Sequence, residues 1–179
     1  MYDPKRKLLF VHVAKSGGSS VVYYYTRGVF PELKTEESEH VIYQNYVKQN
    51  FLVDPFAPIK PNGKPLHELG PHAWITQYEK FLNLDEYFKF SIIREPANYC
   101  FSNAHFIDSK GKIRIDKFFK FEKFNEVFDF ISEFLGDTNI PKGNSNNKPY
   151  GKLLNENTQE IKDIVNNHFK QDYEFWNTL

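Results

Sequence analysis

Residues 8–27 read LLFVHVAKSGGSSVVYYYTR, and this stretch decides the fold of the chain. Its first part, residues 8–13, is a mostly apolar run with the length of a strand that is buried on both faces. Residues 15–20 are a lysine followed by small serines and glycines, and a helix is expected from there, with Ser19 or Ser20 as its N-cap and Gly28 as its end. A strand, a glycine-containing loop and a helix in this order direct loop amides and a helix N-terminus at a phosphate or sulfate.

The loop departs from the common nucleotide-binding pattern. That pattern, G-x-x-x-x-G-K-[ST], places its lysine after the second glycine. Here Lys15 comes before both glycines, and no glycine precedes it. A Gly-Gly pair between a strand and a helix can also be only a tight turn, so the structural alternative stays open at this point.

Length and composition describe one ordinary globular domain. The chain has 179 residues, of which 40% are hydrophobic and 26% charged, so we treat residues 1–179 as a single domain. Lys+Arg and Asp+Glu balance at 23 each, which gives no overall field to attract nucleic acid. The single cysteine excludes an internal disulfide and a cysteine-rich metal site. The apolar run near the N-terminus is too short for a signal segment or a membrane span, so we expect a cytoplasmic protein without a membrane span.

A second buried strand is expected at residues 88–93, FKFSII. A helix over residues 72–83, with His72 in its first turn, leads to it. Two strands joined through helices indicate a parallel sheet. Arg94 then lies at the C-terminal end of its strand, as Lys15 does at the end of the first, and ligands bind at this edge of open α/β sheets.

The segment between these two halves is expected to be an insertion or lid. Residues 29–71 show weak periodicity and carry five prolines within their last seventeen positions. Prolines at this density preclude regular structure. Because long loops in compact domains are mostly functional or disordered, we predict that residues 29–71 face the substrate acceptor.

The C-terminal third is expected to be helical. An apolar stripe at helical spacing runs from Phe124 to Leu135 and predicts a helix, with Asn125 as its N-cap and Gly136 as its stop. A further helix is expected over 158–169. Two large aromatic residues, Phe175 and Trp176, are expected to anchor the tail on the core.

Two motifs resemble those of the PAPS-dependent sulfotransferases, whose sulfuryl donor is 3′-phosphoadenosine 5′-phosphosulfate (PAPS). Residues 15–20 resemble their 5′-phosphosulfate loop, K-[ST]-G-[GT]-[ST]-S, at every position. Residues 94–102 resemble their 3′-phosphate motif, R-[DE]-P-x-x-R-x-x-S, except that Tyr99 stands where many members have arginine. The C-terminal half is similar to the carbohydrate-type, or family 2, enzymes.

The resemblance implies a fold and a set of site residues. The fold is a P-loop-like, three-layer α/β/α domain with a central parallel sheet. The activity is transfer of a sulfuryl group from PAPS to a hydroxyl acceptor, a saccharide being one candidate, with PAPS as the only co-substrate and no metal. Lys15 and His72 are the implied catalytic residues. The residues implied to bind PAPS are Lys15, Ser16, Gly17, Gly18, Ser19, Ser20, Arg94 and Ser102.

The chemistry of the transfer supports these residue types. Negative charge grows on the leaving oxygen and on the sulfuryl oxygens, so the site needs preorganised donors such as a lysine and loop amides. The planar fork of Arg94 suits a phosphate. The acceptor hydroxyl needs a base, which favours histidine. His72 is our choice, with His67 and His105 as alternatives, whereas His12 is expected to be a satisfied core residue.

Two other functions remain open from the sequence. One is a nucleotide or small-molecule kinase with an atypical phosphate loop, which would require ATP and Mg²⁺. The other is a non-catalytic module that binds PAPS or its product, adenosine 3′,5′-bisphosphate, without transferring a group.

Overall fold

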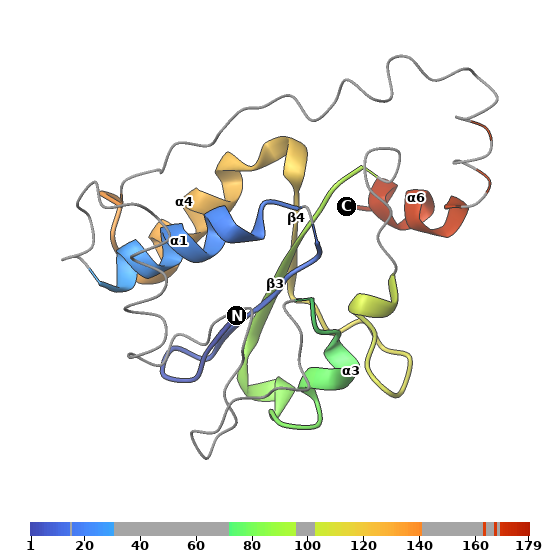
Figure 1. The fold of residues 1–179 in the computed structure, drawn as a ribbon, viewed down its shortest axis with the longest axis horizontal. Helices are drawn as coiled ribbons and strands as arrows, with labels where there is room; N and C mark the ends of the chain where they lie inside the picture. Colours follow the sequence, from blue (N-terminus) through green and yellow to red (C-terminus); the bar gives the residue numbers. More distant parts are fainter. Residues whose placement is uncertain (15, 31–71, 96–102, 141–162, 164–166, 168) are drawn as a thin grey trace.

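The protein has a mixed α/β fold in which helices pack against a four-stranded, mostly parallel sheet (Figure 1). The computed structural model describes residues 1–14, 16–30, 72–95, 103–140, 163, 167 and 169–179. The expected lid beyond Phe30 and most of the helix expected at 158–169 lie outside the described residues, and their predictions stay open.

The sheet is built on the two strands that the sequence predicts. Its strands, in spatial order, are β1 (Tyr2–Asp3), β2 (Leu8–Val11), β3 (Phe88–Ile93) and β4 (Lys117–Lys120). β1 is antiparallel to β2, whereas β2, β3 and β4 are parallel, with Phe10 opposite Phe90 and Ile93 opposite Lys120. The predicted parallel pairing is confirmed. Because the three strands are parallel, the chain leaves all of them at the same edge of the sheet.

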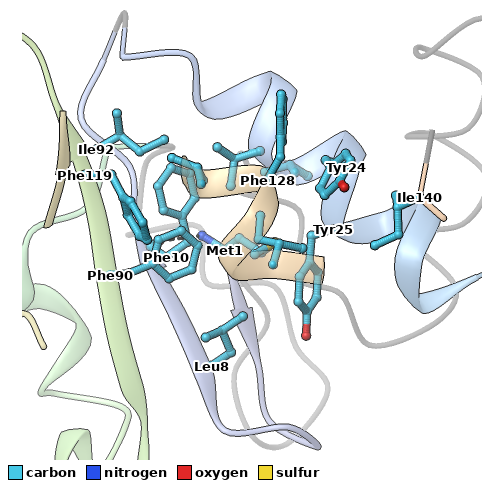
Figure 2. Packing of buried hydrophobic residues seen from close by; sticks show 14 residues of the cluster. Met1, Leu8, Phe10, Tyr24, Tyr25, Phe90, Ile92, Phe119, Phe128 and Ile140 are labelled. Atoms are coloured by element: carbon cyan, nitrogen blue, oxygen red, sulfur yellow. Dashed lines mark hydrogen bonds between the residues drawn. The ribbon is translucent and has the colours of Figure 1, made fainter. Parts of the chain in front are cut away.

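Helices α1 (Gly18–Val29) and α4 (Asn125–Leu135) cover one face of the sheet. Figure 2 shows the core beneath them, where aromatic rings pack together with aliphatic side chains. Phe10 and Phe90 stack across β2 and β3 with ring centroids 4.9 Å apart, and the rings of Tyr24 and Phe128 join the two helices at 4.4 Å. The Tyr24 hydroxyl also hydrogen bonds to Ser132 Oγ at 2.7 Å, so α1 and α4 are fixed by both apolar and polar contacts.

The sequence suggested that Gly28 ends α1, but this residue lies inside the helix. A Cβ atom at this position would come within 2.5 Å of Leu135 Cδ1 and of Ile140 Cδ1. The glycine therefore allows α1 to approach the end of α4 closely. The helix instead ends at Val29, with Phe30 as its C-cap.

The ends of α4 agree closely with the prediction. The helix begins at Asn125 and Phe124 is its N-cap, one residue before the cap that we expected. Gly136 ends it in the left-handed conformation, at φ 68°, which a residue without a Cβ adopts at little cost.

The other face of the sheet is covered by shorter elements. These are α3 (Ile75–Tyr78), α6 (Lys170–Asn177) and the 3₁₀ turns η3 (Leu84–Glu86) and η4 (Asn103–His105), and a further turn, η5 (Phe121–Lys123), follows β4. Phe175 and Trp176 of α6 pack against this second core, which confirms the predicted anchoring of the tail.

The helix expected over residues 72–83 is wrong in its extent, because α3 has only four residues. Gln77 Oε1 accepts the Trp74 backbone N–H at 2.8 Å, which caps the helix two residues after His72. Asn83 then accepts the Asp85 N–H and starts η3 instead of continuing the helix. Local capping bonds thus divide an apolar stripe that is compatible with one longer helix.

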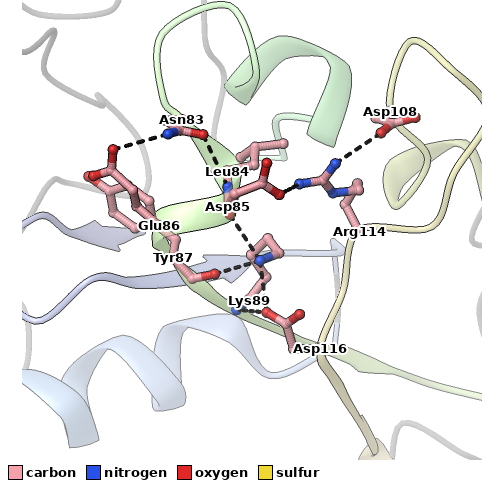
Figure 3. A network of polar contacts seen from close by, with 9 residues as sticks. All are labelled: Asn83, Leu84, Asp85, Glu86, Tyr87, Lys89, Asp108, Arg114 and Asp116. Carbon is pink, nitrogen blue, oxygen red and sulfur yellow. Dashed lines mark hydrogen bonds and ion pairs between the residues drawn. The ribbon is translucent and has the colours of Figure 1, made fainter.

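A buried lysine connects the start of β3 to the chain before β4 (Figure 3). Lys89 Nζ donates to backbone carbonyls of the preceding turn and pairs with Asp116 at 2.8 Å. Arg114 extends the network to two further carboxylates, Asp85 and Asp108. The buried ammonium group therefore has an acceptor for each of its hydrogens, as a buried charge requires. The same contacts fix the register of β3 and β4 at the edge opposite to their C-terminal ends.

Candidate functional site

The loop after β2 is held in shape by its own backbone and by one buried hydroxyl. Ser16 is fully buried, and its Oγ donates to the Val13 carbonyl at 2.6 Å. Gly17 follows at φ 78° and is the N-cap of α1. The expectation that Ser19 or Ser20 caps the helix is wrong, because both lie in its first turn. A left-handed turn at a glycine starts the helix earlier than a serine cap would.

The N-terminus of α1 presents backbone N–H groups at the C-terminal edge of the sheet. The first intrahelical bond runs from the Val21 N–H to the Gly17 carbonyl, at 3.3 Å. The N–H groups of Gly18, Ser19 and Ser20 precede it and so have no acceptor within the helix. The first turn carries no acidic side chain. Together with the helix dipole, these amides favour an anion.

Both glycines of the loop lie against ring side chains. A Cβ on Gly17 would overlap the Phe124 ring and come within 3.2 Å of Phe121 Cε2. A Cβ on Gly18 would overlap the imidazole of His12. The Gly-Gly pair is therefore required by two close approaches as well as by the positive φ of Gly17.

Arg94 follows β3 on the same edge of the sheet. Its guanidinium carbon lies 4.7 Å from the centroid of the Phe121 ring. Its Nε is buried and has no hydrogen-bond partner among the described residues. Because Phe121 contacts both Arg94 and the edge of Gly17, the loop after β2 and the arginine after β3 share one neighbour. These two predicted parts of the site thus lie on a common surface.

His72 is connected to the same loop. Its Nδ1 is 3.2 Å from the carbonyl oxygen of His12, directly after β2. A carbonyl oxygen can only accept, so Nδ1 carries the hydrogen. In the neutral ring Nε2 then has the free lone pair, which is the state that a general base needs. His72 was expected in the first turn of a helix, but it lies before α3 and is held by its contact with the His12 carbonyl.

His12 lies beside the loop and His72, and the sequence did not identify it as a residue of the candidate site. It was expected to be a satisfied residue within the strand, but it follows the end of β2 and its buried Nδ1 has no hydrogen-bond partner among the described residues. Its ring stacks on Phe10 and meets the His72 ring edge-on at 4.6 Å. Burial, then His72 and the chain's amino group, lower the pKa of His12 from 6.5 to about 3, so this imidazole is neutral at physiological pH. The sequence signal that could have identified His12 as a neighbour of the site is its position three residues before Lys15.

His105, an alternative base, lies on η4 beside a different aromatic residue. Its ring centroid is 5.1 Å from that of Trp74, which is 42% exposed. Trp74 comes two residues after His72, so both histidines adjoin the segment that leads into α3. Lys15, Ser102 and His67 lie outside the described residues, and their predicted roles stay predictions.

Comparison with known proteins gives no match to a protein-family model, a curated protein or a solved structure. The described residues contain no group of three or more His, Cys, Asp or Glu side chains placed to hold a metal ion. None of the helices that the structure describes is long and apolar enough to cross a bilayer.

The contact between Gly18 and His12 predicts the effect of one added methyl group. Replacing glycine by alanine in a helix is normally favourable. Here we expect Gly18→Ala to lower the free energy of unfolding by about 1–3 kcal/mol, because the methyl group displaces a buried ring. Urea denaturation measures the change, with Ser19→Ala, at an exposed position of the same turn, as the matched control. In a His12→Ala background the cost should disappear, and an unchanged cost in that background contradicts the assigned contact.

The lowered pKa of His12 predicts a pH dependence of stability. Since the folded state disfavours the charged ring, His12 takes up a proton on unfolding when the pH lies between about 3 and 6.5. Its contribution is therefore complete above 6.5 and is lost as the pH falls toward about 3, with a slope of up to about 1.4 kcal/mol per pH unit. Urea denaturation across this range should give a shallower slope for His12→Gln than for the unsubstituted protein. Parallel slopes would refute the assignment.

Proposed function

We propose that this protein is a PAPS-dependent sulfotransferase that transfers the sulfuryl group to a hydroxyl acceptor, with a carbohydrate as the first acceptor class to test. One observation carries the proposal. The amide-bearing N-terminus of α1 and the guanidinium of Arg94 lie at the ends of adjacent parallel strands and contact the same aromatic residue, Phe121. Two anion-binding elements on one surface suit a nucleotide with phosphate groups at both ends of its ribose.

The 5′-phosphosulfate is assigned to the loop after β2. The N–H groups of Gly18, Ser19 and Ser20, which have no acceptor within the helix, would hold its oxygens, and the dipole of α1 would favour its charge. The Ser16 hydroxyl donates within the loop, so we assign this residue to shaping the loop through Val13. Lys15, by its place in the motif, is assigned to the charge that develops on the leaving oxygen.

The 3′-phosphate is assigned to Arg94 and, by the resemblance of residues 94–102, to Ser102. An arginine fork can donate two parallel hydrogen bonds to one phosphate. Among the described residues Arg94 forms no ion pair with a carboxylate, and its buried Nε has no hydrogen-bond partner. No described side chain therefore competes with an anion for the guanidinium.

His72 is assigned as the general base. Its Nε2 would take the proton of the acceptor hydroxyl while the oxygen forms a bond to sulfur and the bond from sulfur to the bridging phosphate oxygen breaks. The products are the sulfate ester and adenosine 3′,5′-bisphosphate. The hydrogen bond from Nδ1 to the His12 carbonyl supports this role, because it holds the tautomer that can accept.

The finer description of the fold is part of the proposal. Helical elements on both faces of a parallel sheet, with the anion-binding loop after the strand β2, support a P-loop-like, three-layer α/β/α domain. We assign residues 29–71 to the acceptor side of the site, as an insertion or lid.

Calorimetric titration tests the nucleotide. We expect adenosine 3′,5′-bisphosphate to bind more tightly than ATP, both with and without Mg²⁺. Arg94→Ala should weaken the bisphosphate by about tenfold to a hundredfold, since it removes a charge-assisted hydrogen bond to a phosphate. Arg114→Ala, an arginine at the opposite edge of the sheet, is the matched control and should leave the affinity unchanged. A preference for ATP that depends on Mg²⁺ would instead identify the kinase alternative.

Turnover of sulfur-labelled PAPS on a panel of hydroxyl acceptors tests the base. We expect His72→Ala to lower turnover by about a hundredfold or more while nucleotide affinity stays within about twofold, because a base acts on the acceptor only. His105→Ala is the comparison. A larger loss in His105→Ala assigns the base to His105, and equal loss of turnover and nucleotide affinity in His72→Ala makes His72 structural. Nucleotide binding without transfer to any acceptor would identify the non-catalytic module.

A further inference from the structure

Phe121 contacts both halves of the candidate nucleotide site. It is the first residue of η5, directly after β4. The guanidinium carbon of Arg94 lies 4.7 Å from its ring centroid, and its Cε2 lies 3.2 Å from the place of a Cβ on Gly17. The side chain is partly buried and packs at the margin of the first core, so one part of the ring is held by the core and another part faces Arg94.

A chain of rings connects Phe121 to the core. Phe121 meets Phe124 edge-on at 5.6 Å, and Phe124 meets Phe128 edge-on at 5.1 Å. Phe128 packs on Tyr24 of α1 within the core beneath the two helices. Ring pairs with these geometries are favourable and resist sliding. The face that Phe121 turns to Arg94 is therefore held by rigid elements.

The backbone beside Arg94 is tied to the same turn. The Glu95 N–H donates to Glu122 Oε1 at 3.1 Å, so the residue after Arg94 is bonded to the residue after Phe121. A second contact at the next position limits how far the arginine can move along the ring. It also occupies one oxygen of the Glu122 carboxylate with a backbone donor.

The aromatic contact has a chemical consequence for Arg94. A ring face attracts a guanidinium and fixes its plane but accepts no strong hydrogen bond from the edge of the fork. A carboxylate in the same place would occupy the N–H groups. Phe121 thus orients the cation and leaves its donors for a ligand, which fits the absence of a partner for Nε among the described residues.

From these contacts we infer that Phe121 is a positioning residue, which holds the guanidinium of Arg94 in the plane that receives the 3′-phosphate of the nucleotide. The inference rests on the proposed function. It adds a residue that lies outside both sequence motifs and acts through Arg94 without touching the reacting atoms.

The test compares two nucleotides that differ only in the 3′-phosphate. Calorimetry gives the affinity of each variant for adenosine 3′,5′-bisphosphate and for AMP, and the ratio of the two affinities reports the 3′-phosphate contact alone. Phe121→Leu keeps an apolar side chain but removes the ring face, so we expect the ratio to fall by about tenfold. Phe121→Tyr keeps the ring and should retain the ratio. Thermal unfolding verifies that each variant is folded.

Phe134→Leu is the matched control. Its ring is also partly buried and packs on Phe130, and no ring contact joins it to Phe121 or to Arg94 among the described residues. We expect this substitution to leave the affinities for both nucleotides, and therefore the ratio, unchanged. In an Arg94→Ala background, Phe121→Leu should also leave the ratio unchanged, because the group that it positions is gone.

The outcomes separate the inference from the proposed function. If the unsubstituted protein binds the bisphosphate no better than AMP, Arg94 recognises no 3′-phosphate, and both the proposed function and the inference fail. If the unsubstituted protein prefers the bisphosphate and Phe121→Leu keeps that preference, only the inference fails. A folded Phe121→Tyr variant that loses the preference also contradicts it.

Discussion

Parallel pairing of β2 with β3 is the constraint on which the rest of the structure depends. The register sets Val11 opposite Ser91, and Ser91 Oγ donates to the Val11 carbonyl at 2.7 Å, which fixes the end of the shorter strand. Beyond that point both chains leave the sheet at one edge, so the loop before α1 and Arg94 come together although they are far apart in sequence. The same pairing places Phe10 on Phe90 and starts the aromatic core beneath α1 and α4.

Aromatic residues give this edge of the sheet its rigidity. The chain has 18 phenylalanines, and three of them link the core to the loop and to Arg94 by successive ring contacts. Glycines at positions 17 and 18 then let the loop backbone lie directly on rings. The anion site that we propose here would be preorganised, because the groups assigned to the ligand are supported by packed side chains and would need little adjustment on binding.

Sequence reasoning succeeded where a signal is local and strong. The apolar runs that became β2 and β3, and the stripe that became α4 with Gly136 as its stop, could be recognised from residue pattern alone. β4 could not, since KFFK is a four-residue strand whose only buried member is Phe119 and which forms only by pairing with β3.

The misplaced helix ends have tertiary or capping causes. Gly28 resembles a helix stop, but the close approach of Leu135 and Ile140 explains it, and this contact joins residues more than a hundred positions apart. The helix expected from His72 is divided by capping bonds at Trp74 and Asn83. In each case the sequence pattern is compatible with two structures. A contact that cannot be recognised from the spacing of apolar residues determines which of them forms.

Burial places the two neighbouring histidines in different surroundings. His12 lies between Phe10, Gly18 and His72, so charging it would place a cation in an apolar site beside the positive end of α1. It stays neutral and contributes its backbone carbonyl, which orients the ring of His72. His72 is only half-buried, and its Nε2 is the atom that we propose takes the proton of the acceptor hydroxyl. His12 therefore forms part of the frame, whereas His72 is the proposed base, and only the fold distinguishes the two residues.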